Sequence, residues 1–347
     1  MPKGIPVSSW RSNATRREKW FASLLARVII KTTKSESRAM SYPFLRKLTF
    51  LRSMGLRHFL YKVQGLFVRP RIQFERHLGA FRGTGLEIGG PSAVFRKGGL
   101  FPAYETAQRV DNITFSRKTR WEGDVKAGKN FVFHPQKEPG IQFVLEGGGL
   151  SSLPEARYDF ILSCHMLEHT ANPLSVLHEW KRLLKTEGNL LLILPHRDGT
   201  FDHRRPVTTL NHLVDDFEKN RGEDDSTHWQ EILEMHDIRR DPQQASTADF
   251  EKWIRANATN RGAHHHVFDI RVSVQMLTHA GFQISDVVAT MPFHIFMLAT
   301  KLPGYKDVSN ERFLRADAEP YRKSPFRSDR LHGRATLTMD SSPSQAV

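Results

Sequence analysis

The sequence predicts an α/β fold in which short strands alternate with helices around a mostly parallel sheet. Three observations support this prediction. From Gly85 onward, short apolar runs alternate with stretches at helical spacing. The aliphatic run Leu190–Leu194 ends at Pro195, as expected of a central parallel strand buried on both faces. A glycine turn at Gly89 directly follows the first apolar run. The core should therefore extend from about residue 81 to residue 301.

The elements of this core can be placed in chain order. The expected strands are Gly85–Ile88, a second ending near Asp111, a third near Ile141–Leu145, then Tyr158–Ser163, Leu190–Leu194, Ile284–Ala289 and His294–Thr300. The expected helices are Leu174–Leu184, which Gly188 should end, and Asp269–Ala280, which Gly281 should end.

Two segments depart from the alternation. Residues 200–266, after the fifth expected strand, are polar, charge-dense and helical in pattern, and such an insertion commonly builds a lid or an acceptor pocket. Residues 302–347 are polar with little apolar periodicity, so we expect a disordered C-terminal tail.

The net charge of +14 is concentrated at the N-terminus. Residues 1–80 hold 17 Lys and Arg but only Glu18, Glu36 and Glu75 as acids, so the remainder of the chain is balanced. We expect a basic extension, partly disordered and partly helical (43–79), that could lie on an anionic membrane surface or on nucleic acid. A solvated tail with helices packed on the core is an equally weighted alternative. The acid-poor residues 1–35 could also be a transit peptide, which we weight less.

Cysteine content and hydropathy exclude several classes of protein. Cys164 is the only cysteine, which excludes a disulfide framework and a thiolate metal cluster and is consistent with the cytoplasm. No apolar run approaches the ~20 residues that a transmembrane helix needs. We therefore expect a cytoplasmic protein, either free or peripheral at a membrane, and no metal site.

The glycine turn and a later carboxylate indicate a nucleotide ligand. In Leu86-Glu87-Ile88-Gly89-Gly90-Pro91-Ser92, small residues at the end of a strand let the backbone approach a ligand closely. Asp111 follows Gly89 by about 20 residues, where a carboxylate can hold a ribose diol. A capping role for Asp111 is the alternative. No G-x-G-x-x-G follows the first strand, which disfavours a nicotinamide enzyme.

Three segments, LEIGGPS, YDFILSCHMLEHTANPLSVLHEWKRLLKTEGNLLLILPH and AGFQI…FHIFMLATK, resemble class I S-adenosylmethionine-dependent methyltransferases, particularly the type 11 methyltransferase domain. The similarity covers roughly residues 82–200 and 265–301. It implies a Rossmann-like seven-stranded sheet with helices on both faces, an antiparallel last strand, and S-adenosylmethionine across the carboxyl ends of the strands. The cofactor contacts that the resemblance implies are Glu87, Gly89, Gly90, Asp111, Gly149 and Leu150. The loop after the fourth strand adds His165.

The candidate catalytic residues follow the fifth strand. They are His196, Asp198 and His203, where a general base for a hydroxyl acceptor is expected. Arg204 and Arg205 could hold an anionic or sugar acceptor. His264-His265-His266, at the far end of the insertion, could fold back beside them. Two alternatives remain: Asp198, Asp202 and the histidines as ligands of a divalent metal, or histidines that only order a lid. Glu168 and His169 either act at the site or pin the next helix.

Together these observations predict a methyltransferase that acts on a small-molecule or glycan-type acceptor, at an oxygen atom. An RNA-binding methyltransferase that docks through residues 1–80 is the first alternative, and a non-catalytic scaffold that retains the fold is the second.

Overall fold

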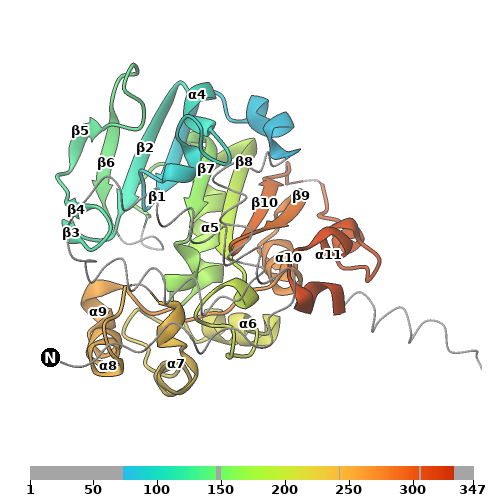
Figure 1. The fold of residues 1–347 in the computed structure, drawn as a ribbon. Coiled ribbons are helices and arrows are strands. Elements are labelled where there is room, and N and C mark those ends of the chain that lie inside the picture. Colours follow the sequence, from blue (N-terminus) through green and yellow to red (C-terminus); the bar gives the residue numbers. More distant parts are fainter. Residues whose placement is uncertain (1–72, 146–149, 242, 305, 332–347) are drawn as a thin grey trace, which may run out of the picture. The chain divides into compact units, whose positions relative to one another are not determined.

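The computed structural model of the chain describes residues 73–145, 150–241, 243–304 and 306–331 (Figure 1). Most of the basic extension, including the expected helices before residue 73, lies outside the described residues, as does Gly149. Gln73–Ala80 form a 3-10 helix, η2. None of the described helices has the length and hydrophobicity that crossing a bilayer requires.

The centre of the fold is an eight-stranded sheet. In spatial order its strands are β5 (Gly128–Phe131), β6 (Gly140–Val144), β2 (Arg109–Thr114), β1 (Thr84–Ile88), β7 (Tyr158–Cys164), β8 (Leu184–Pro195), β10 (His294–Thr300) and β9 (Gln283–Thr290). The strands from β6 to β8 are parallel, whereas β10 pairs antiparallel with both β8 and β9. All seven expected strands are present and the last is antiparallel, as predicted. The eighth, β5, adds an antiparallel edge beside β6.

The alternation of side chains along β8 explains why both faces of the sheet are covered. Leu190, Leu192 and Leu194 belong to one buried cluster, and Leu191 and Ile193 belong to the other. The first cluster includes residues of α5 (Pro173–Leu183) and α10 (Ile270–His279). The second includes residues of η2, η3 (Ala93–Phe95) and α4 (Ala103–Thr106). Helices therefore lie on both faces, as predicted.

The boundaries of the two expected helices have local causes. At the start of α5, the Asn172 side chain accepts a hydrogen bond from the Ser175 backbone amide at 3.0 Å. Gly281, with φ +75°, follows α10 as expected. The prediction that Gly188 ends α5 is wrong. The backbone is already extended at Leu184, which pairs with Tyr158, so Gly188 lies inside β8.

The insertion after β8 is helical, as its charge pattern predicts. It contains α6 (Leu210–Glu218), α7 (Trp229–Met235), η6 (Ile238–Arg240), α8 (Thr247–Arg255) and α9 (Asn257–Asn260) (Figure 1). It has a small core of its own: Ile232, Phe250, Ile254 and Ala263. A backbone hydrogen bond of 2.8 Å from the His265 amide to the Glu168 carbonyl joins its far end to the loop after β7.

The expected disorder of the C-terminal tail is wrong for residues 306–331. They form η7 (Glu311–Phe313) and α11 (Glu319–Lys323), and Phe313, Tyr321 and Phe326 join the main core. These aromatic residues are too irregularly spaced to produce a helical pattern, so the sequence did not reveal them as core residues.

The C-terminal segment is held by His196, one of the expected catalytic residues. Its fully buried ring stacks on Phe326 at 3.9 Å, and its Nε2 lies 3.1 Å from Oδ2 of Asp329. The Nδ1 atom accepts a hydrogen bond from the Asp198 amide. The Asp198 carboxylate in turn accepts from the Ser328 amide at 3.1 Å. These contacts give His196 and Asp198 structural roles, which corrects the catalytic assignment.

We expect His196→Ala to lower the free energy of unfolding by about 3 kcal/mol, because it removes a buried ring that stacks on Phe326 and leaves the Asp329 carboxylate with only the Ser324 hydroxyl as partner. Denaturant titration of the full chain measures this. His279→Ala, which removes an exposed histidine at the end of α10, is the matched control and should have little effect. Equal stability of the two variants would contradict the structural role of His196.

Candidate functional site

A cavity of about 640 Å³ lies where the carboxyl ends of the parallel strands meet the insertion. Strand-end residues line one part of it: Ile88, Gly89, Ile113, Thr114, Leu145, Cys164 and His165. Residues of the insertion line the other part, including Phe201, Asp202, Ile232, Phe250, Trp253 and His264. The two parts correspond to a crevice at the end of an α/β sheet and to the expected lid.

The glycine turn after β1 is built for close approach of a ligand. Gly89 lines the cavity with φ +76°, a conformation that favours glycine, and its amide donates to the Ile113 carbonyl at 2.8 Å. At Gly90 a Cβ would lie 2.3 Å from the Glu87 carboxyl carbon, so no larger residue fits there. The predicted turn therefore exists, and Gly89 is the part of it that faces the cavity.

Glu87, expected to contact the cofactor, supports the turn from behind. Its carboxylate is fully buried, accepts from the Ser92 amide at 2.9 Å and from the Tyr104 hydroxyl, and does not line the cavity. Burial raises the pKa of Glu87, although these hydrogen bonds oppose the shift. Asn112 fixes the other side of the turn by accepting from the Gly90 amide at 2.9 Å.

Asp111 does not end its strand, which corrects the sequence-based placement. The strand β2 continues to Thr114, and the buried Asp111 carboxylate is not part of the cavity lining. Instead it accepts from the Ile141 amide at 2.9 Å and from the Tyr158 hydroxyl at 3.2 Å. Asp111 thus ties β6 and β7 to β2, and the structure gives it no access to a ribose.

Thr114 occupies the position that was expected of Asp111. It is the last residue of β2, it lines the cavity, and only 2% of its surface is exposed. Among the described residues, its hydroxyl has no hydrogen-bond partner. A buried hydroxyl without a partner at a strand end is suited to receive a ligand hydroxyl. With Gly89, it gives this part of the cavity a glycine turn beside an unpartnered hydroxyl.

Of the remaining expected cofactor residues, His165 lines the cavity and Leu150 does not. His165 lines the cavity with φ +53°, and its Nε2 lies 2.7 Å from Nδ1 of His294. Leu150 is fully buried in the main core and is not part of the cavity lining.

A polar group lines the cavity where the loop after β7 meets the insertion. It includes His165, Glu168, His169, Asp202 and His264, all of which line the cavity. The Glu168 carboxylate is buried, with Oε1 3.5 Å from Nδ1 of His165 and 4.0 Å from Nε2 of His169. Burial would raise the pKa of Glu168, but the surrounding histidines outweigh it and lower the pKa. Glu168 is therefore an anion at neutral pH.

His169 is a neutral imidazole that is held in one tautomer. Its Nδ1 lies 3.1 Å from the Ala263 carbonyl, which can only accept, so Nδ1 carries the proton and Nε2 has the free lone pair. Burial, together with neighbouring His264, lowers the pKa of His169 to about 4. The ring is thus neutral at physiological pH and directs a basic nitrogen toward the carboxylate of Glu168.

Asp202 and His264 form an ion pair beside His169. The Nδ1 atom of His264 lies 2.6 Å from Oδ2 of Asp202, and the His264 ring is 4.7 Å from that of His169. Burial would lower the pKa of His264, but the Asp202 carboxylate raises it. The expectation that the histidine run folds back beside the segment after β8 is therefore confirmed for His264.

The other residues after β8 serve the insertion itself. Nε2 of His203 lies 3.1 Å from Asp237, and His203 is absent from the cavity lining, so the expected catalytic role has no geometric support. Arg205 is buried and donates to Asp202 and to the carbonyls of His264 and His265. Arg204 lies beside Asp237 at 3.5 Å. Neither arginine is part of the cavity lining, so the predicted grip on an anionic acceptor is not formed by them.

The alternative in which Asp198, Asp202 and the histidines bind one metal is not supported, because the two carboxylates have the separate partners described above. At the cavity, Glu168, His169 and His264 are residues of types that bind metals. One potential ligand atom of each lies within 4.8 Å of the others. His169 and His264 each already hold a hydrogen bond through Nδ1.

Comparison with known proteins gives one family match. The model of a methyltransferase domain matches residues 82–287, which is more than half of the chain. No curated protein matches the sequence.

Solved structures with a related fold have low identity. A SAM-dependent methyltransferase from Aquifex aeolicus is 14% identical, with 65% of this chain and 87% of that chain covered and a TM-score of 0.30. SAM-dependent methyltransferases from Methanosarcina mazei give 15% identity, 63% and 92% coverage and a TM-score of 0.33. The 1,6-didemethyltoxoflavin-N1-methyltransferase of Burkholderia thailandensis, solved with 1,6-didemethyltoxoflavin and S-adenosylhomocysteine, is 12% identical, with 77% and 94% coverage and a TM-score of 0.35.

Proposed function

Because the chain belongs to the methyltransferase domain family and is an S-adenosylmethionine-dependent methyltransferase, we propose that it methylates an oxygen of a small-molecule or glycan-type acceptor held under the insertion. The observation that carries this proposal is the position of His169. It presents an unprotonated, oriented nitrogen inside the same cavity whose other part is formed by Gly89 and Thr114.

The strand-end part of the cavity is the proposed cofactor site. When bound, S-adenosylmethionine supplies an electrophilic methyl group on a sulfonium sulfur. Gly89 would lie against the amino-acid end of the cofactor, and the Thr114 hydroxyl would bind a hydroxyl of its ribose. Glu87 and Asn112 hold the glycine turn in place. Leu145, at the end of β6, offers an apolar surface for the adenine.

The insertion part of the cavity would orient the acceptor and remove its proton. Methyl transfer requires mainly that the acceptor oxygen be held in line with the methyl carbon. When the acceptor oxygen takes the methyl group, the cofactor would leave as its neutral thioether, S-adenosylhomocysteine, and Nε2 of His169 would accept the hydroxyl proton. The resulting imidazolium is stabilised by the Glu168 carboxylate, 4.0 Å away. The Asp202–His264 pair lies beside the His169 ring and would hold it in position.

The lining of this part suits a hydroxylated ring. Its aromatic side chains, Phe201, Phe250 and Trp253, provide flat apolar surfaces, to which Trp121 and Phe293 add from outside the insertion. Arg240, Gln243 and Gln244 line the same cavity with groups that can form hydrogen bonds. Sugars and hydroxylated aromatic compounds both present apolar faces and polar edges.

Incubation of the full chain with isotope-labelled S-adenosylmethionine and a panel of sugars, phenols and RNA tests the proposal. Label in a hydroxyl compound as an ether supports it. Label in RNA favours the RNA-binding alternative, in which the chain docks through residues 1–80, most of which lie outside the described residues. Failure of the chain to bind S-adenosylmethionine favours the non-catalytic scaffold.

A further inference from the structure

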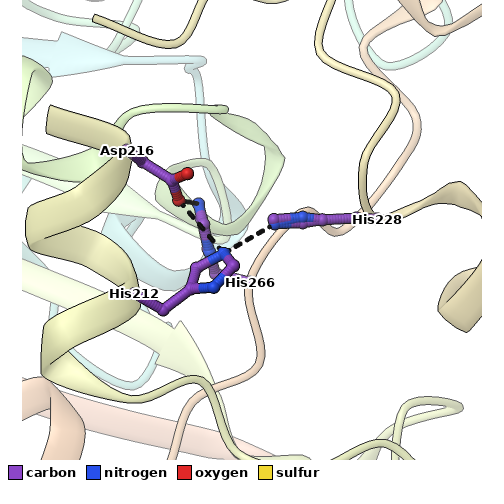
Figure 2. A group of neighbouring side chains, drawn as sticks. All are labelled: His212, Asp216, His228 and His266. Atoms are coloured by element: carbon purple, nitrogen blue, oxygen red, sulfur yellow. Dashed lines mark hydrogen bonds and ion pairs between the residues drawn. The ribbon is translucent and has the colours of Figure 1, made fainter. Parts of the chain in front are cut away.

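A second group of polar side chains lies in the insertion, apart from the cavity. His212 and Asp216 come from one face of α6, His228 immediately precedes α7, and His266 ends the histidine run (Figure 2). None of the four belongs to the cavity lining. Figure 2 shows the three imidazole rings and the carboxylate turned toward one another.

The distances within this group match those between ligands of one metal ion. Nε2 of His212 lies 3.0 Å from Nε2 of His228 and 3.2 Å from Oδ2 of Asp216. The same carboxylate oxygen lies 3.7 Å from Nε2 of His266. Four ligands at the zinc–nitrogen and zinc–oxygen distances of a tetrahedral site are about 3.3 Å apart. Three of the six separations are thus close to the tetrahedral value, and all four ligand atoms lie within 4.8 Å of one another.

One acceptor atom of this group, Oδ2 of Asp216, lacks a hydrogen-bond donor among the described residues. Asp216 is buried, and among the described residues its Oδ2 has no donor aligned for a hydrogen bond, although two imidazole nitrogens lie near it. A buried carboxylate oxygen without such a donor is costly unless a cation compensates it.

We propose that His212, Asp216, His228 and His266 bind one Zn²⁺ ion in a tetrahedral structural site. Three imidazoles and a carboxylate are a ligand set that zinc prefers, and four protein ligands leave no open position for chemistry. His266 also lies 3.2 Å from the Ala171 carbonyl through Nε2, so metal binding moves the ring proton to Nδ1. His212 is partly exposed, which provides a path for entry of the ion.

The proposed ion would join three parts of the insertion that the chain separates. It would connect α6, the segment before α7 and the irregular segment 264–266, whose His264 lines the cavity. The metal would therefore hold the histidine run in place two residues from the Asp202–His264 pair. This role is independent of the proposed reaction. The single cysteine excludes a thiolate zinc site, but it does not exclude one that histidines and a carboxylate form.

Metal titration of the full chain, stripped with a chelator, tests the site. The wild-type chain should take up one equivalent of Zn²⁺ in competition with a chromophoric chelator. His212→Ala removes the most exposed ligand and should weaken binding by about 100-fold or more, since loss of even an outer-sphere partner costs about 10–100-fold. His279→Ala is the matched control and should bind as the wild type does.

Three outcomes would overturn the proposal. One is the absence of stoichiometric uptake by the wild-type chain, and a second is unchanged affinity in His212→Ala. A third is retention of the ion in His212→Ala with loss in His169→Gln, which would place the metal at the cavity. If His212→Ala does not fold, the absorption spectrum of the wild-type chain loaded with Co²⁺ tests the coordination number instead. Intense bands of a four-coordinate ion support the site, and the weak spectrum of an octahedral ion contradicts it.

Discussion

Replacement of His169 by Gln should lower kcat by roughly 10²–10⁴-fold with a hydroxyl acceptor, the usual contribution of a positioned general base. Gln retains a hydrogen-bonding group of similar reach but cannot accept a proton at neutral pH. Because His169 is expected to touch the acceptor and not to hold the adenosyl group, the affinity for S-adenosylhomocysteine should stay at the wild-type value. Steady-state kinetics and calorimetry of the same preparation measure the two effects.

The pH profile separates a base from a merely structural histidine. A base acts in its neutral form, so activity should fall as pH is lowered through about 4, the pKa to which burial lowers that of His169. This limb should be absent from His169→Gln. His279→Gln, at an exposed position, is the control and should keep both the rate and the profile. A His169→Gln variant with the wild-type rate would contradict the assigned base.

Replacement of Gly89 by Arg should weaken binding of S-adenosylhomocysteine by about 100-fold or more, equivalent to about 2.8 kcal/mol. The backbone at Gly89 has φ +76°, which an L side chain adopts at a cost, and the new side chain would enter the cavity. Calorimetric titration of the full chain measures the loss.

Two further variants show whether the loss is specific to the cavity. Gly98→Arg introduces the same side chain at a similar φ of +77° on the surface, so it should retain affinity. Asp111→Asn disturbs the buried contacts to Ile141 and Tyr158, and should lower the free energy of unfolding while retaining affinity. Loss of binding in Asp111→Asn with unchanged stability would restore the ribose role predicted from the sequence.

The pattern of strands and helices could be predicted because it depends on local apolar runs. All seven expected strands exist, and the antiparallel β10 follows from the resemblance to the family. The edge strand β5 could not be predicted, because Gly128–Phe131 has three exposed residues and no alternating pattern. The ordered segment 306–331 was missed for a related reason: three separate aromatic residues hold it, without any periodicity.

The site was predicted at the level of segments but not of individual side chains. The position of the glycine turn was predicted correctly, as was the return of the histidine run to the segment after β8. Spacing along the chain could not show which way a side chain faces. Asp111 lies three residues before the end of β2, so its carboxylate packs inside the sheet and Thr114 reaches the cavity. His196 and His203 have carboxylate partners far along the chain, which no local pattern reveals.

The location of the adenosyl ligand is the central claim, and a crystal structure of the full chain with S-adenosylhomocysteine tests it most directly. We predict that the ribose lies within hydrogen-bonding distance of the Thr114 hydroxyl, the amino-acid end against Gly89, and the sulfur on the side that faces His169. A ligand bound among the helices of the insertion, or one whose ribose contacts Asp111 instead of Thr114, would contradict the account.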